Sequence, residues 1–122
     1  MENGKKVIGV LRDLMFRVKI QAAAKQAGLE PVFVESQRDA LARAREDPAV
    51  IILDLNEAAV EPLDTITKLK SDEQTRGVKL LCFVSHVQVD LKQAAQERGC
   101  DAVMARSALS QNLPAILSRY AG

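Results

Sequence analysis

Short runs of apolar residues recur along the chain and alternate with longer segments in which apolar residues return every three or four positions. The clearest run covers residues 50–53, where all four side chains are aliphatic and three are β-branched. Pro48 precedes this run and Asp54 follows it. An uninterrupted apolar run between turn-forming residues is typical of a strand buried on both faces. The pattern therefore predicts a parallel sheet with helices on both sides.

Five strands and five helices are predicted to alternate along the chain. The strands cover residues 7–11, 31–34, 50–53, 78–84 and 102–105. The helices cover residues 14–27, the segment between 36 and 48, the segment from 62 to a polar loop at 71–77, and residues 87–98 and 110–120. Elements that alternate in this way form a doubly wound α/β domain with right-handed connections.

Turn and capping residues bound the predicted helices. Gly28 and Gly99 follow the first and fourth helices, where glycine accommodates a left-handed backbone. Ser36 is expected to cap the second helix. Pro62 and Pro114 are placed in the first turns of the third and fifth helices, where a missing N–H costs little.

Composition limits the classes of function. The chain has 122 residues, of which 48% are apolar and 27% are charged, and we expect one compact globular domain over residues 1–122. The formal net charge of +1 gives no electrostatic reason to expect nucleic acid or an anionic membrane as a partner. No apolar stretch approaches the roughly 18 residues that span a bilayer. We expect a cytoplasmic protein.

The cysteine and histidine content predicts no metal site. Cys82 lies within the fourth strand and Cys100 in a turn, and neither has a second cysteine pair or a histidine cluster near it in the sequence. We expect two reduced thiols. His86 is the only histidine, and we interpret it as an exposed loop residue, although it could also titrate near the strand ends.

Polar residues occur where the predicted strands end. Asp54 follows the third strand and Ser85 ends the fourth, and open α/β sheets place their sites at these carboxyl ends. Together with Glu61 and the turn at 99–101, their order and spacing resemble the receiver domain of bacterial two-component response regulators over almost the whole chain. The resemblance implies a flavodoxin-like receiver fold with strand order 2-1-3-4-5. It also implies that Asp54 is at the phosphoacceptor position and that Ser85 is the hydroxyl residue that contacts the phosphoryl group.

Several positions depart from the family pattern. Leu11 and Arg12 stand where receivers keep two acidic residues that hold Mg²⁺, and Asp13 is acidic but lies one residue late. Arg106 replaces the lysine after the fifth strand, and Val103 replaces the aromatic residue within it. Mg²⁺ needs several oxygen ligands in octahedral geometry, so one carboxylate beside a positive charge should bind it poorly. We therefore expect an atypical receiver without a metal or another cofactor.

Three roles stay open for Asp54: a phosphoacceptor, a carboxylate neutralised by arginine, or a cap of the strand end. We expect Arg12 or Arg106 within ion-pair distance of Asp54, which would lower the pKa of that carboxyl. The pocket would then comprise Arg12, Asp13, Ser85 and Arg106. The alternatives are a solvated Arg12, an ion pair between Arg106 and Asp13, and a Ser85 that bonds only the backbone.

The pattern favours a signalling module that binds a protein partner independently of aspartate phosphorylation. The alternative is a phosphorylatable receiver, in which Asp13 or Glu57 must replace the missing acid and Mg²⁺ is required. A flavodoxin-like or cobalamin-type cofactor domain is disfavoured, because residues 12–15 offer no phosphate loop and no histidine ligand motif. No nucleophile–base pair can be built, and we expect no enzyme.

Two surfaces are candidates for the partner. In receivers the fourth helix, fifth strand and fifth helix form the usual partner face, which here would have Val89 and Val103 at an apolar centre and Lys92 on the polar rim. A second apolar stripe lies on the first helix, at Met15, Val18 and Ala22. We expect neighbouring loops to cover this stripe; the alternative is a partner surface or a weak homodimer.

Overall fold

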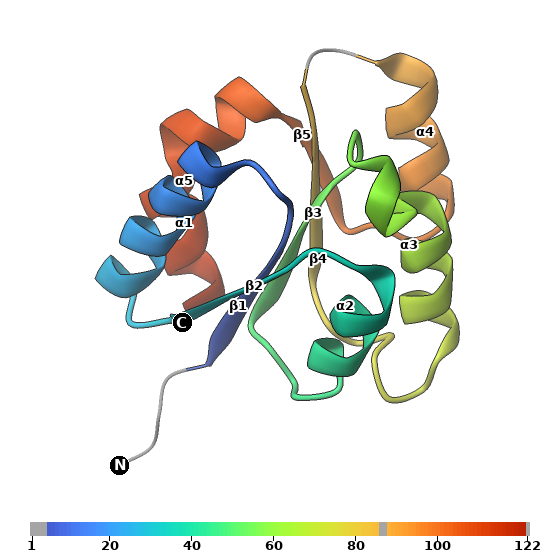
Figure 1. The fold of residues 1–122 in the computed structure, drawn as a ribbon, viewed down its shortest axis with the longest axis horizontal. Coiled ribbons are helices and arrows are strands. Elements are labelled where there is room, and N and C mark those ends of the chain that lie inside the picture. Colours follow the sequence, from blue (N-terminus) through green and yellow to red (C-terminus); the bar gives the residue numbers. More distant parts are fainter. Residues whose placement is uncertain (1–4, 86–87, 122) are drawn as a thin grey trace.

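Strands and helices alternate along the chain as predicted (Figure 1). The computed structural model describes residues 5–85 and 88–121. The elements are β1 (Lys6–Val10), α1 (Leu14–Gln26), β2 (Glu30–Val34), α2 (Gln37–Ala44), β3 (Val50–Asp54), the 3-10 helix η1 (Ala58–Val60), α3 (Pro62–Ser71), β4 (Leu80–Val84), α4 (Val89–Glu97), β5 (Ala102–Ala105) and α5 (Arg106–Ala121).

The five strands form one parallel sheet in the order β2-β1-β3-β4-β5, which confirms the predicted fold. All five residues of β3 are buried, as expected for the central strand. The edges of the sheet are β2, which contains Pro31, and β5, which has four residues. This order brings the carboxyl ends of β1, β3 and β4 together, with Asp54 in the middle.

Helices cover both faces of the sheet and enclose two hydrophobic cores. Figure 1 shows α1 and α5 on one side of the sheet and α2, α3 and α4 on the other. Because side chains alternate along a strand, Val7 packs in the core beneath α1 and α5 while Ile8 packs in the opposite core. Phe16 and Phe83 make an edge-to-face contact within the first core, with ring centroids 4.9 Å apart. Phe16 follows the end of β1, so this contact fixes the start of α1 against the sheet.

The predicted start of α2 is confirmed, and the predicted start of α5 is wrong. Ser36 caps α2 by accepting a hydrogen bond from the Asp39 N–H, as expected. The last helix begins at Arg106 instead of residue 110, so Pro114 lies inside α5 and not in its first turn. The hydrogen bond that Pro114 cannot make is offset by burial of one face of α5 at Leu109, Leu113, Ile116 and Leu117.

The structure also differs from the prediction in the loop after β3 and in the bounds of β4 and α4. The 3-10 helix η1 was not predicted, and the residue after it, Glu61, has a left-handed backbone with φ 47°. The strand predicted over 78–84 begins at Leu80, and the helix predicted over 87–98 is α4, Val89–Glu97. The predictions for His86 and Val87 lie outside the described residues. Over the ranges 5–85 and 88–121, no helix is both long and apolar enough to cross a membrane.

Candidate functional site

Asp54 lies at the carboxyl end of β3 and is 8% exposed. Its Oδ1 accepts a hydrogen bond of 2.8 Å from the backbone N–H of Asn56. Burial raises the pKa of the Asp54 carboxyl above its usual range; the hydrogen bond from Asn56 opposes this shift, and the nearby charge of Glu57 adds to it. Asp54 therefore stabilises the turn after β3 through the hydrogen bond from Asn56. Burial makes the ionised form of its carboxyl less stable than it would be in water.

Asn56 connects the ends of β3 and β4. Its side-chain oxygen accepts hydrogen bonds from the backbone N–H of Ser85 at 2.7 Å and from the Ser85 hydroxyl at 3.0 Å. Its amide nitrogen donates to the side-chain oxygen of Gln88 at 2.7 Å. Sequence reasoning missed Asn56, although an amide two residues after a strand-end aspartate is a recognisable turn signal. Ser85 is thus held on the rim of the site, facing Asn56.

Asp13 and Arg106 form a second polar cluster, at the ends of β1 and β5. One carboxylate oxygen of Asp13 caps α1 by accepting a 3.0 Å hydrogen bond from the Phe16 N–H. The other carboxylate oxygen forms an ion pair with Arg106. The guanidinium carbon of Arg106 also lies 5.0 Å from the centroid of the Phe16 ring, within cation–π range. The cluster therefore ties α1 to the junction of β5 and α5.

Arg12 faces away from Asp54 and towards the start of α2. Its guanidinium lies 3.7 Å from the carboxylate of Glu35, which also accepts a 2.7 Å hydrogen bond from Arg17. Arg17 in turn donates two hydrogen bonds to the carbonyl oxygen of Leu11, at 2.8 and 3.0 Å. Arg12 and Arg17, the two arginines near the end of β1, therefore share Glu35 as their anionic partner.

The predicted ion pair between Asp54 and an arginine is wrong. Arg12 pairs with Glu35 and Arg106 pairs with Asp13, and among the described residues no lysine or arginine forms an ion pair with Asp54. The expected lowering of the Asp54 pKa is wrong for the same reason, because burial without a cationic partner raises it. Of the predicted pocket residues, Asp13 and Arg106 come together, while Arg12 and Ser85 contact other groups.

The end of β1 offers few free oxygen ligands for a cation such as Mg²⁺. Leu11 is fully buried and offers no side-chain oxygen, and both carboxylate oxygens of Asp13 already have partners. Over residues 5–85 and 88–121, no three His, Cys, Asp or Glu side chains converge as metal ligands. Mg²⁺ in proteins is usually held by one or two carboxylates together with waters and phosphate oxygens, and at these strand ends Asp54 is the carboxylate without a cationic partner among the described residues.

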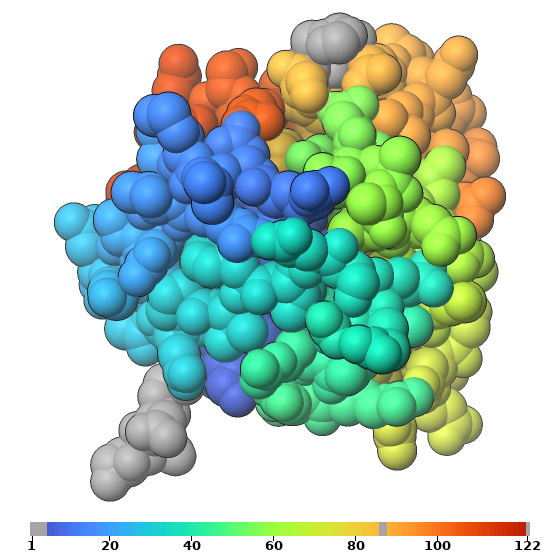
Figure 2. Space-filling view, in the orientation of Figure 1, coloured from blue at the N-terminus to red at the C-terminus, as the bar shows by residue number. Residues whose placement is uncertain are grey.

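The predicted stripe on α1 is exposed, whereas the surface of α4 and β5 includes one residue, Val103, that is half-buried. Val89 on α4 is 66% exposed and Lys92 is exposed, whereas Val103 is half-buried and packs against the core beneath α2, α3 and α4. On α1, Met15 is 76% and Val18 is 65% exposed, and α1 (blue) lies open at the surface in Figure 2. The prediction that loops cover the α1 stripe is therefore wrong.

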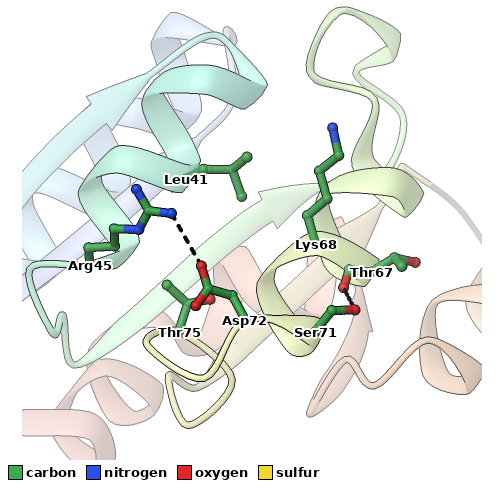
Figure 3. A pocket seen from close by; sticks show the side chains of 7 residues that line it. All are labelled: Leu41, Arg45, Thr67, Lys68, Ser71, Asp72 and Thr75. Atoms are coloured by element: carbon green, nitrogen blue, oxygen red, sulfur yellow. Dashed lines mark hydrogen bonds and ion pairs between the residues drawn. The ribbon is translucent and has the colours of Figure 1, made fainter.

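A cavity of about 350 Å³ lies elsewhere, between α2 and α3 (Figure 3). Its polar groups already have partners within the protein. Arg45 donates to Asp72 at 3.2 Å, the Ser71 hydroxyl donates to the carbonyl of Thr67 at 2.6 Å, and Thr75 donates to a backbone carbonyl at 2.6 Å. The polar groups of this cavity are therefore used in contacts that hold α2, α3 and the loop after α3 together, and the strand ends are the better candidate site.

Comparison with known proteins defines the fold. No protein-family model and no curated protein sequence matches the chain. The structure is similar to the chemotaxis response regulator CheY4 of Vibrio cholerae, with 21% identity, a TM-score of 0.81 and coverage of 96% of this chain and 98% of that one. It is also similar to the Mn²⁺-bound response regulator Rcp1, with 15% identity, a TM-score of 0.82 and coverage of 96% and 94%.

A third similar structure is the receiver domain of the sensor histidine kinase PA1611 from Pseudomonas aeruginosa PAO1, which has a magnesium ion in its active-site cleft. It is 17% identical, with a TM-score of 0.81 and coverage of 98% of each chain. The chain therefore has the flavodoxin-like receiver fold of two-component response regulators. At these identities the similarity establishes the fold, and the function has to be argued from the strand ends.

Proposed function

We propose that this chain is an atypical receiver module that binds a cytoplasmic signalling protein without phosphorylation of Asp54. The observation that carries the proposal is the set of contacts at the end of β1. There the two positions that would supply metal ligands hold a buried leucine and an arginine paired with Glu35, and Asp13 is committed to Arg106. The proposal needs no cofactor and assigns no catalytic residue to the chain.

The charge balance at Asp54 supports this proposal. Phosphoryl transfer requires a cation that neutralises the charge on the transferring oxygens. Asp54 has no cationic partner among the described residues, and the raised pKa of its carboxyl reflects the cost of keeping even one negative charge there. A phosphoryl group would add further negative charge at the same position.

The partner surface is proposed to be the face formed by α4 and β5, with Val89 at its centre and Lys92 at its rim. Val89 is a large apolar residue, 66% exposed, on a helix whose other exposed residues are polar. Exposed apolar side chains ringed by polar residues are typical of protein contacts. Val103, which is half-buried below α4, would support this face from beneath. The exposed stripe on α1 is the competing surface.

One observation favours the alternative, a phosphorylatable receiver with unusual metal ligation. Glu57 lies close enough to Asp54 to raise the pKa of its carboxyl, so two acidic residues share the loop after β3. In that case Glu57 would have to turn towards Asp54 and give up the 3.3 Å hydrogen bond that it accepts from the Ala59 N–H.

Treatment with acetyl phosphate and Mg²⁺ separates the two proposals. We expect no phosphoryl adduct by intact-mass spectrometry and no fluorine resonance from bound beryllofluoride. Asp54→Ala is the control for the site, and Glu57→Gln is the control for the alternative. An adduct that disappears in both variants would refute phosphorylation independence and support the alternative.

Affinity capture with surface variants locates the partner surface. Proteins bound by the wild type without acetyl phosphate should be lost with Val89→Asp and weakened with Lys92→Glu. The matched control is Val18→Asp on α1, because Val18 and Val89 are valines of nearly equal exposure, 65% and 66%. Loss of binding in the control alone would move the proposed surface to α1. Loss of binding in neither variant would exclude both surfaces.

A further inference from the structure

Cys82 and Cys100 lie side by side, one on β4 and the other in the turn before β5. Cys82 is in the middle of β4 and is fully buried, and Cys100 precedes β5 and is 8% exposed. Their sulfur atoms are 2.7 Å apart and both thiols are free. We propose that this pair is a redox-sensitive modification site, in which Cys100 reacts with a hydroperoxide and Cys82 then closes an intramolecular disulfide.

The turn that carries Cys100 is held tightly against β4. The Cys100 N–H donates to the carbonyl of Ala95 at 3.1 Å, and the Asp101 N–H donates to the carbonyl of Leu80 at 3.0 Å. The Asp101 carboxylate accepts hydrogen bonds from the Leu80 N–H at 2.8 Å and from the Lys70 amine at 3.1 Å. Because these contacts fix the turn, the two sulfurs stay close together without a change in the backbone.

Gly99 allows this arrangement. It has φ +109°, a backbone conformation that other residues rarely adopt, and a Cβ at this position would lie 3.0 Å from the side chain of Lys70. The turn therefore brings Cys100 in over β4 while leaving room for Lys70. The sulfurs need to approach by well under 1 Å to reach the roughly 2.05 Å of a disulfide bond.

The two thiols have different chemical environments. The pKa of the Cys100 thiol is lowered, chiefly by its hydrogen bond with Cys82, and this favours the nucleophilic thiolate. Burial raises the pKa of the Cys82 thiol well above its usual range. Cys100 is also the only one of the two with measurable exposure. Cys100 is therefore suited to attack an oxidant, and Cys82 to attack the oxidised product.

The reaction balances in two steps. The Cys100 sulfur attacks the terminal oxygen of the hydroperoxide, the O–O bond breaks, and Cys100 becomes a sulfenic acid. The proton of the Cys100 thiol goes to the second oxygen, which leaves as water or an alcohol. The Cys82 sulfur then attacks the Cys100 sulfur, the S–O bond breaks, and the Cys82 proton leaves with the hydroxide as water. The two cysteines are oxidised by two electrons, and the hydroperoxide is reduced by two.

The disulfide would enclose α4, because the cysteines lie 18 positions apart and α4 lies between them. Closing a loop of this length reduces the freedom of the unfolded chain, so oxidation should raise the melting temperature by on the order of 10 °C. The oxidised and reduced forms should therefore differ most in the stability of α4 and β5.

The experiment treats the reduced full chain with hydrogen peroxide and then alkylates it under denaturing conditions without a reductant. We expect the intact mass to fall by two hydrogen atoms, with no alkylation, and dithiothreitol to restore two alkylatable thiols. Peptide mapping should recover a Cys82–Cys100 cross-link in the monomer. Two thiols that stay alkylatable, or cross-linking between chains alone, would overturn the proposal.

Single variants test the order of the two steps. In Cys82→Ala, dimedone should trap a sulfenic acid at Cys100. In Cys100→Ala, Cys82 should react at least tenfold more slowly than Cys100 does in the other variant, because it is fully buried. Circular dichroism checks that each variant is folded, and Cys100→Ser replaces Cys100→Ala if the latter is not. Equal reactivity of the two cysteines would refute the assigned roles.

Discussion

The ends of β1 and β3 each carry an aspartate, and the two carboxylates have opposite electrostatic surroundings. Asp13, at the end of β1, caps α1 and pairs with Arg106. Asp54, at the end of β3, is buried, accepts one backbone hydrogen bond and has no cationic partner among residues 5–85 and 88–121. The protein therefore uses the charge of Asp13 to hold elements together, and it keeps the charge of Asp54 uncompensated.

This difference shows that two acids at neighbouring strand ends can have opposite electrostatic surroundings. Arg106 pairs with Asp13 and Arg12 pairs with Glu35, and neither arginine forms an ion pair with Asp54. A partly exposed ion pair stays in contact with water. The carboxylate and the guanidinium therefore lose less hydration free energy when both remain charged. A buried carboxylate without such a partner shifts its pKa upwards instead. Asp54 therefore lies at the carboxyl end of a buried strand, and its charge has no cationic partner among the described residues.

The largest effect is expected from Asp13→Ala, which removes both contacts at the end of β1. We expect the free energy of unfolding to fall by about 1–2 kcal/mol, the sum of a lost helix cap and a partly exposed ion pair. Urea denaturation measures the change. Asp13→Asn is the matched control, since it keeps an oxygen for the cap but loses the charge. A loss as large in Asp13→Asn would show that the ion pair, and not the cap, dominates.

A smaller effect is expected from Asn56→Ala at the end of β3. This change removes the hydrogen bonds to Ser85 and Gln88, and we expect it to cost about 1 kcal/mol, because Asn56 is exposed and water replaces the lost partners. Amide hydrogen exchange should also become faster at Ser85. Asn56→Asp, which keeps the acceptor for Ser85 and loses only the donor, is expected to retain most of the protection. Unchanged exchange in Asn56→Ala would mean that Asn56 does not couple the two strand ends.

The smallest effect, and the one most specific to the comparison, is expected from Asp54→Asn. The asparagine oxygen can still accept the hydrogen bond from the Asn56 N–H, while the uncompensated charge is removed. We expect the variant to be as stable as the wild type at low pH and more stable by up to about 1 kcal/mol at neutral pH.

The pH dependence follows from the direction of the Asp54 shift. The pKa of this carboxyl is higher in the folded state than in the unfolded state, so the folded state binds the proton more tightly. Its contribution to stability is complete below the unfolded value of about 3.9 and is lost as the pH rises through the folded pKa. The difference between the unfolding free energies of the wild type and Asp54→Asn, taken at each pH, measures the contribution of the Asp54 carboxyl to stability. A difference that shrinks with rising pH would contradict the raised pKa.

The fold was largely predictable because its signals are local. Apolar runs located every strand, and Ser36 marked the start of α2 by the capping hydrogen bond that the structure contains. The start of α5 was missed because Arg106 follows β5 directly, with no turn residue between the two elements. Burial of Leu109 and the ion pair of Arg106 extend the helix towards the strand, and neither contact leaves a local pattern.

The site was less predictable because its contacts join distant segments. The helix predicted from residue 14 places Asp13 just before its start, but the hydrogen bond by which Asp13 caps α1 was not predicted. The partner of Arg12 could not be predicted, since Glu35 belongs to the segment after β2 and nothing in the spacing favours it over Asp54. The spacing of Asn56 from Asp54 indicates a turn, but its hydrogen bonds to Ser85 join two loops that are distant in sequence and could not be predicted.

The outer strands of the sheet have a consequence for how the protein behaves in concentrated solution. Edge strands offer unpaired backbone groups to which other chains can add, and this is a common route to aggregation. Here one edge, β2, includes Pro31, which lacks the N–H that strand addition needs, and the other edge, β5, ends after four residues where α5 begins. Neither edge is a good template for a further strand. Copies of this chain should therefore resist amyloid-like stacking, and any contact between them should be made by side chains.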